Sequence, residues 1–183
     1  LYFARHDGQA VTCDDFISAM ADANDIDLSA FSLWYRQAGT PQLSARRISR
    51  DGQYLTLELA QKLEPTAAGT PTDAMPIPVR LGFVAGDGRS LAHSIDGGDV
   101  SDEHIVLLEG DRQLIDISFT DGESAAEAIP SLLRGFSAPV RLYDDLCAEE
   151  LGVLAAYDAD SFNRYEACQR LAHNVLGARL DGQ

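Results

Sequence analysis

The chain has 183 residues, of which 45% are hydrophobic and 23% are charged, a composition typical of a folded globular protein and not of a disordered or fibrous one. Its 14 basic residues are outnumbered by 29 acidic ones, which gives a formal net charge of −15 at pH 7. A surface this acidic repels phosphate backbones, so nucleic acid is excluded as an expected partner.

Two helices are predicted within the first 40 residues. Thr12 and Asp15 have the spacing of a capping box, in which each side chain accepts a hydrogen bond from the backbone of the other. Apolar residues follow at helical spacing. A second helix is predicted to begin at Asp27 or Ser29 and to end at Gly39, because glycine readily takes the left-handed conformation that ends a helix. Its apolar residues are Leu28, Phe31, Trp34, Tyr35 and Ala38.

From residue 41 onward the hydrophobic period changes from 3.6 to 2. In the segment QYLTLELA, Leu55, Leu57 and Leu59 alternate with other residues, and the preceding Asp51-Gly52 pair predicts a hairpin with a strand over 43–49. Short strands with turn residues between them predict an antiparallel sandwich of about seven strands, immunoglobulin-like in size. The other expected strand segments are 77–84, 89–94, 103–109, 112–119, 131–136 and 140–143, with turns at 86–88, 110–111 and 137–139.

Helical periodicity returns after the strands. A helix is predicted over 148–157, and a longer one begins at Asp160 or Ser161. The expected fold is therefore mainly β with α flanks: an immunoglobulin-like antiparallel β-sandwich between N-terminal and C-terminal helices. The buried stripe predicted for the longer helix comprises Phe162, Tyr165, Cys168, Ala172, Val175 and Leu176.

The histidines and cysteines do not form a recognisable catalytic motif. A zinc peptidase needs two histidines one helical turn apart with a glutamate beside them, and no pair among the four histidines has this HExxH spacing. Cys168 and His173 lie on different sides of their predicted helix, which argues against a catalytic pair, and a GxSxG elbow is absent from the sequence. The histidines are His6, His93, His104 and His173.

Two acidic segments are interpreted as structural. Residues 96–103 superficially resemble a calcium loop but lack its ligand register, so an acidic turn is favoured. Residues 144–150 are typical of a helix N-terminus, where carboxylates suit the helix dipole. We therefore predict no catalytic, cofactor-binding or metal-binding residues in this chain.

Cysteine usage and hydropathy bear on location. Cys13, Cys147 and Cys168 are too few and too scattered for a disulfide framework, and their odd number favours a reducing compartment. They are predicted to be small buried hydrophobic residues. Because no run of 18 apolar residues and no signal pattern occurs, we expect a soluble cytoplasmic protein with no membrane partner.

Four blocks of sequence resemble, in the same order, segments of the bacterial aminopeptidase N family, the M1 zinc aminopeptidases. LYFARHDGQAVTCDDF resembles the signature just past the family's catalytic core, and DLSAFSLWYRQAGTP its Trp-Tyr helix and exit into the next domain. IPSLLRGFSAPVRL resembles the last strands of the family's β-sandwich, and DSFNRYEACQRL the first long helix of its C-terminal helical domain. The resemblance implies three parts: residues 1–40 as the helical tail of the catalytic domain, 41–145 as the sandwich domain, and 146–183 as the start of the helical domain.

The resemblance also implies what this chain lacks. The family's HExxH motif, third glutamate ligand, GxMEN motif and transition-state tyrosine lie upstream of the first block, and none of these motifs is present here. No catalytic residue of the family corresponds to a position in this sequence. His6 and Asp14 are expected to be structural, bonding the helix where the catalytic domain closes.

The function implied is that of a non-catalytic middle fragment of a zinc aminopeptidase, which removes N-terminal residues from peptides. Zinc is expected in the parent enzyme and not in this chain, and the expected partners are the missing catalytic and C-terminal helical domains, with peptide substrates for the parent only. The sandwich would act as a spacer between those domains. The alternative is a free-standing immunoglobulin-like binding module that functions through loops 64–76 or 96–102.

The fragment interpretation predicts a large apolar surface near the N-terminus, because side chains there would pack against a missing domain. The residues expected to contribute to this surface are Leu1, Tyr2, Phe3, Phe16, Ile17, Phe31 and Trp34.

Overall fold

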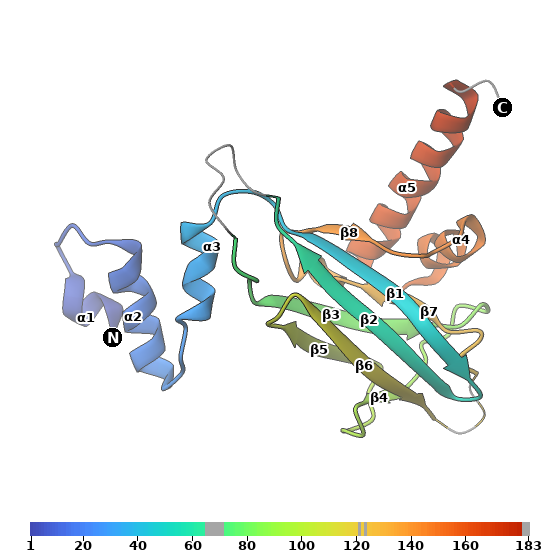
Figure 1. Ribbon diagram of the computed structural model, residues 1–183, viewed down its shortest axis with the longest axis horizontal. Coiled ribbons are helices and arrows are strands. Elements are labelled where there is room, and N and C mark those ends of the chain that lie inside the picture. Colours follow the sequence, from blue (N-terminus) through green and yellow to red (C-terminus); the bar gives the residue numbers. More distant parts are fainter. Residues whose placement is uncertain (65–71, 121, 123, 181–183) are drawn as a thin grey trace.

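Two β-sheets form the centre of the molecule, and helices flank them at both ends (Figure 1). The computed structural model describes residues 1–64, 72–120, 122 and 124–180. One sheet has the strand order β4-β6-β2-β1-β8 and the other the order β5-β3-β7. The strands are β1 (Gln42–Asp51), β2 (Tyr54–Lys62), β3 (Ile77–Val84), β4 (His93–Ile95), β5 (Glu103–Leu108), β6 (Arg112–Phe119), β7 (Ile129–Leu132) and β8 (Arg141–Tyr143).

The hairpin predicted around the Asp51-Gly52 pair is confirmed. β1 and β2 are antiparallel, with Asp51 opposite Tyr54, and Gly52 has a φ of +57°, the left-handed conformation that a tight hairpin turn requires. The register shifts between Arg47 and Ser49, which marks a β-bulge. The one parallel pair among the described strands is β1 with β8, in which Gln42 lies opposite Arg141.

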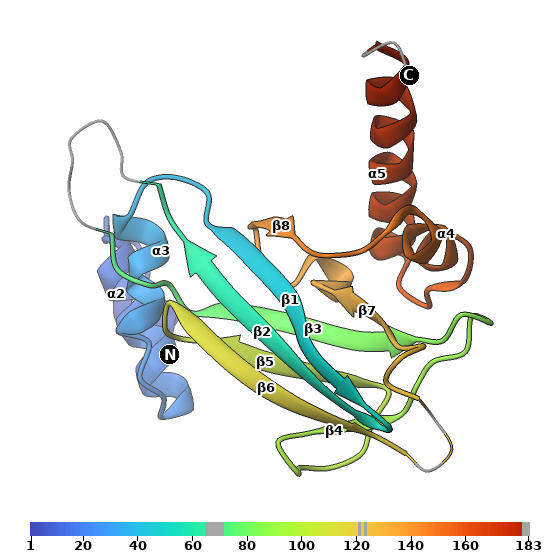
Figure 2. The same cartoon turned by 45° about the vertical axis from the view of Figure 1, so that its right-hand side comes forward.

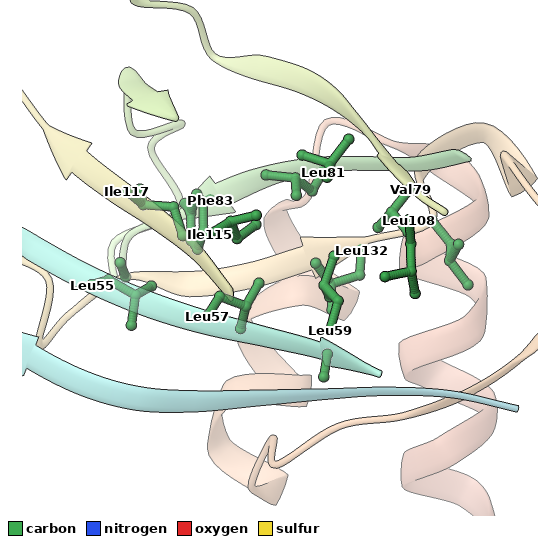
Figure 3. Close-up of a cluster of buried hydrophobic side chains, with 14 of the residues drawn as sticks. Leu55, Leu57, Leu59, Val79, Leu81, Phe83, Leu108, Ile115, Ile117 and Leu132 are labelled. Atoms are coloured by element: carbon green, nitrogen blue, oxygen red, sulfur yellow. The ribbon is translucent and has the colours of Figure 1, made fainter. Parts of the chain in front are cut away.

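The inward-facing side chains of the two sheets form the main hydrophobic core (Figure 3). The period of 2 in β2 places Leu55, Leu57 and Leu59 on one face, where all three are buried. Phe83 of β3 packs edge-on against Phe119 of β6, with 5.1 Å between the ring centroids, which ties the two sheets together. The immunoglobulin-like sandwich predicted from the sequence is confirmed.

Two of the expected strand segments differ from the prediction. Residues 89–92 form no strand apart from an isolated bridge at Ser90. The segment 131–136 is not one strand: β7 ends at Leu132, and Leu133, Gly135 and Phe136 all have positive φ, so the chain turns into a 3-10 helix, η2 (Arg134–Phe136). The segments 110–111 and 137–139 each join strands of different sheets.

The N-terminal segment forms α1 (Tyr2–His6), α2 (Cys13–Asn24), a 3-10 turn η1 (Ala30–Ser32) and α3 (Leu33–Arg36). The capping box of α2 is confirmed, because Thr12 N–H donates to Asp15 and Asp15 N–H donates to the Thr12 hydroxyl. The second predicted helix is shorter than expected. Asp27 accepts hydrogen bonds from the backbone and hydroxyl of Ser29, a local pattern that competes with helix formation.

The predicted apolar surface near the N-terminus is partly present. Phe3 is 78% exposed, and Leu1, Phe16 and Phe31 are also exposed. Ile17 is buried, contrary to the prediction, and with Ala19 it forms the buried part of α2. Trp34 likewise packs partly against the core of this chain, and its indole N–H donates to the carbonyl of Pro76 over 3.0 Å.

The C-terminal helices are α4 (Ala148–Tyr157) and α5 (Ser161–Leu180), and α5 extends away from the sandwich (Figure 2). The stripe predicted to be buried on α5 is wrong: Tyr165, Val175 and Leu176 are all more than half exposed. In the described part of the chain, the first turns of α5 contact the sandwich through Asn163 and Ala167, and of the predicted stripe Phe162 does so too, with its ring centroid 5.2 Å from that of Phe136. The prediction of buried cysteines is also wrong. Cys13 and Cys147 lie at the starts of α2 and α4, Cys168 lies on the outer face of α5, and all three are exposed.

Candidate functional site: the junction between the sandwich and the C-terminal helices

A buried polar network joins the three-stranded sheet to α4 and α5. At its centre, the Ser131 hydroxyl on β7 donates to Asp158 over 2.5 Å and accepts hydrogen bonds from Arg134 and Asn163 over 2.9 and 2.7 Å. Ser131 therefore uses its one donor and both of its lone pairs. Because its partners come from η2, from the residue after α4 and from α5, this one hydroxyl connects three elements to the sheet.

Arg134 and Asp158 form the charged pair of this network. Their side chains are 4% and 0% exposed, and Nη2 of Arg134 lies 3.1 Å from Oδ1 of Asp158. Asp158 also accepts a hydrogen bond from the backbone N–H of Asp160 over 2.9 Å. A buried ion pair offsets its desolvation only when the remaining polar atoms are satisfied, and here the surrounding hydrogen bonds meet that condition.

Asp160 anchors the start of α5. One of its carboxylate oxygens accepts a hydrogen bond from the backbone N–H of Asn163, the usual bond of a helix N-cap, over 2.8 Å. The other accepts from the backbone N–H of Gly135 in η2 over 2.9 Å. The amide of Asn163 donates to the carbonyl of Leu132 at the same distance. The orientation of α5 is thus set by hydrogen bonds to the backbone of the sandwich as well as by apolar packing.

Gly82 makes room for this network in the middle of β3. A Cβ atom at this position would lie 2.5 Å from Cζ of Arg134 and 2.8 Å from the backbone oxygen of Asp102. Gly82 has no role among the residues singled out from the sequence, although a glycine inside a strand signals a close approach of other groups. The guanidinium therefore lies directly against the sheet, where any larger residue would displace it.

A second set of ion pairs fixes the exit from the sandwich. Arg47 on β1, whose side chain is 6% exposed, pairs with Asp145 and with Glu150 in the first turn of α4. Asp144 accepts two hydrogen bonds from Arg170 of α5 over 2.5 and 2.8 Å. The acidic segment 144–150 does contain a helix N-terminus, as predicted, but most of its carboxylates also bind arginines of other elements.

Glu150 is ionised more readily than a free glutamate. Burial opposes its ionisation, but hydrogen bonds from Arg47 and from the backbone of Cys147 outweigh that effect and lower the pKa of Glu150. The carboxylate keeps its charge, and its link between β1 and α4, at pH values below those at which an exposed glutamate is protonated.

Most of the residues considered as candidate sites lie apart from one another in the structure. His6 lies in α1 beside the ring of Tyr2, and Asp14 pairs with Arg36 over 3.1 Å while its neighbour Asp15 forms the cap. His173 is exposed on α5. In the loop 96–103, Asp96 accepts a hydrogen bond from the backbone of Asp116, as an acidic turn residue does.

Two histidines are in contact, although their spacing in the sequence does not predict it. The ring centroids of His93 and His104 are 4.8 Å apart. The ring of His93 donates a hydrogen bond to the carbonyl of Leu91 over 2.8 Å, and the ring of His104 donates one to the carbonyl of His93 over 2.9 Å. Nε2 of His93 is buried without a hydrogen-bond partner among the described residues. Within that same part of the chain, no three His, Cys, Asp or Glu side chains are grouped so that they could hold a metal ion.

Two facing sheets, mostly antiparallel strands and a polar junction to flanking helices define an immunoglobulin-like domain with helical extensions. The model of the family described as "Domain of unknown function (DUF3458) Ig-like fold" matches residues 39–145, and the chain belongs to this family.

Curated relatives extend the similarity beyond the sandwich. The chain is 39% identical over 184 residues to aminopeptidase N of Caulobacter vibrioides, a match covering 100% of this chain and 20% of the relative. It is 31% identical over 172 residues to aminopeptidase N of Escherichia coli, covering 93% of this chain and 19% of that relative. The corresponding identity with aminopeptidase N of Haemophilus influenzae is 34%, with the same two coverages. The predicted resemblance is confirmed, and the chain spans about a fifth of the length of these relatives.

A solved structure shows the same fold. The crystal structure of Legionella pneumophila aminopeptidase A in complex with aspartic acid superposes with a TM-score of 0.76 at 22% sequence identity, covering 100% of this chain and 19% of that one. None of the helices in the described part of the chain is both long and apolar enough to cross a membrane.

Proposed function

We propose that this chain is the middle segment of a longer zinc aminopeptidase and that its role there is structural. The relatives named aminopeptidase N match nearly all of the chain, while the chain covers about a fifth of each of them. On this proposal residues 1–40 end the catalytic domain, 41–145 form the sandwich domain and 146–183 begin the helical domain.

Zinc belongs, on this proposal, to the portion of the parent outside this chain. The described residues of this chain do not fit a zinc site, because their His, Cys, Asp and Glu side chains form no group able to hold a metal ion. We therefore assign no catalytic step to this chain.

The observation that carries the spacer role is the buried junction around Ser131. A spacer has to hold the element that follows it at a fixed angle, and this network binds the first turn of α5 to β7 through two hydrogen bonds of Asn163. Such rigidity matters because a misplacement of about 1 Å at a reacting centre can lower a rate about 100-fold. The junction would thus act as a positioning device for the helical domain.

The spacer role predicts a loss of activity in the parent enzyme when the junction is loosened. In the full-length parent, Asn163→Ala removes the two hydrogen bonds to β7, and we expect kcat/KM for an aminoacyl reporter to fall by about 10- to 100-fold. The matched control is Asn174→Ala, since Asn174 is the same residue type on the same helix and is exposed. Equal activity of the two variants, with Asn163→Ala still folded by circular dichroism, would contradict the spacer role.

The non-catalytic status of the chain predicts a simple difference between fragment and parent. The isolated chain supplied with zinc should not hydrolyse an aminoacyl reporter, whereas the parent should hydrolyse it and lose that activity when a chelator removes its metal. Turnover by the purified isolated chain that a chelator abolishes would refute the proposal.

The alternative, a free-standing binding module, makes a different prediction about the gene. An HExxH motif upstream of Leu1 in the same reading frame supports the fragment proposal, and a start codon near Leu1 would favour the module. Of the two loops that such a module would use, residues 65–71 of the first lie outside the described residues. In the second, Asp96 is already bonded to the backbone of β6.

A further inference from the structure

An apolar groove crosses the outer face of the three-stranded sheet, between the N-terminal helices and the loop 137–139. Its volume is about 500 Å³. Pro78 and Leu107 lie opposite each other on β3 and β5 and form its floor, while Phe31, Trp34 and Tyr35 form one wall. Phe31, Tyr35 and Leu107 are each more than 40% exposed, so the groove presents wide aromatic and aliphatic surfaces to solvent.

Two acidic side chains, Asp27 and Glu109, stand at the rim of this groove. Both are exposed, and within the described part of the chain neither of them is in an ion pair. Carboxylates beside aromatic faces attract a cation, since the ring faces carry partial negative charge. The chemistry therefore suits an apolar segment that bears an arginine or a lysine.

The groove lies beside an exposed apolar edge strand, which another segment is expected to cover. β5 is an edge strand of its sheet, and its outward residues Ile105 and Leu107 are 61% and 47% exposed. An edge strand with bare apolar side chains invites pairing with other chains, and natural proteins usually blunt or cover such edges. The groove and the outer face of β5 are adjacent, so one segment can cover both.

We infer that the groove is the docking site for a segment of the parent polypeptide outside residues 1–183, apolar in character and carrying a basic side chain that lies between Asp27 and Glu109. This inference rests on the proposed function, because only a parent several times longer than this chain supplies the segment: the chain covers 19–20% of its aminopeptidase N relatives. Charge complementarity with the acidic rim selects a basic segment. The contact would fix the tail of the catalytic domain and the sandwich on the same neighbouring surface.

The test is the reactivity of a cysteine placed in the groove, compared between the isolated chain and the full-length parent. Leu107→Cys is introduced after the three exposed cysteines of this chain are replaced by serine, and alkylation of the peptide containing residue 107 is followed by mass spectrometry. We expect labelling to be slower in the parent by about tenfold or more, because the docked segment must first open. Leu114→Cys is the control, since Leu114 is 56% exposed on the other sheet and should react equally fast in both proteins.

A charge reversal tests the basic partner. In the parent, Glu109→Lys should restore rapid labelling at residue 107, whereas Glu127→Lys, on an exposed loop, should not. Equal labelling of residue 107 in the parent and the isolated chain would overturn the inference. Labelling of the isolated chain that becomes faster on dilution would overturn it too, because a second copy would then occupy the groove.

The two proposals fail separately. A parent that hydrolyses the aminoacyl reporter while residue 107 stays reactive refutes the docking inference alone. A parent that protects residue 107 but lacks aminopeptidase activity refutes the proposed function alone.

Discussion

Replacing Arg134 by methionine is expected to lower the free energy of unfolding of the chain by about 3–5 kcal/mol. The guanidinium is the counter-charge of Asp158, whose side chain is 0% exposed. Without it, the carboxylate remains buried with only the Ser131 hydroxyl and the backbone N–H of Asp160 as donors. Urea unfolding followed by circular dichroism measures the loss.

Two further variants show whether the buried charge is the cause. Adding Asp158→Asn to Arg134→Met removes the uncompensated charge and should recover much of the lost stability. Arg36→Met is the matched control, because Arg36 pairs with Asp14 at the surface, and its loss should cost at most about 1 kcal/mol. A similar small effect for Arg134→Met and Arg36→Met would show that the junction does not stabilise the fold.

Acidification is expected to destabilise the protein by about 3 kcal/mol through His93 alone. Burial lowers the pKa of His93 to about 4 from its usual 6.5; the nearby His104 and Arg134 act in the same direction, and the carbonyl of Leu91 and Asp102 oppose them. In the unfolded chain His93 takes up a proton as the pH falls through 6.5, but in the folded chain it stays neutral until about 4. The unfolded state therefore binds more protons in this window, and stability falls as the pH is lowered from about 6.5 to 4.

Urea midpoints measured between pH 7 and about pH 5 test this expectation, above the range in which glutamates of the unfolded chain become protonated. Glu150, whose pKa is lowered, adds its own loss of stability as the pH falls below its ordinary pKa of 4.5, because the unfolded chain takes up that proton before the folded chain does. His93→Phe removes the titrating group and should flatten the pH dependence in this window, whatever its effect at pH 7. His173→Phe changes an exposed histidine and should leave the slope as it is. The same slope in wild type and His93→Phe would contradict the assignment.

The features that the sequence predicted correctly are local. Alternation at Leu55, Leu57 and Leu59 and the turn at Asp51-Gly52 involve neighbouring residues, so the β1·β2 hairpin follows from them directly. Alternation identifies a strand but not its partner, and a turn such as 110–111 does not show which strands pair. In the structure β5 pairs with β3 and β6 pairs with β2, since closing a sandwich requires the chain to cross between sheets.

The junction could not be predicted for a related reason. Arg134 and Asp158 are 24 residues apart and meet only because β7, η2 and α4 fold around them. The spacing of apolar residues predicts the stripe on α5, but polar contacts of Asn163 decide which face meets the sandwich. Periodicity gives the position of a helix along the chain, and the tertiary contacts determine its rotation.

The parallel pairing of β8 with the start of β1 has a mechanical consequence. The N-terminal helices precede Gln42 and the C-terminal helices follow Tyr143, so the two flanking segments leave this ladder in opposite directions. Tension between them would load the hydrogen bonds of the two strands in shear, so that several must break together before the strands can slide. Force transmitted along the polypeptide would then load this short ladder together with the junction that binds α5 to β7.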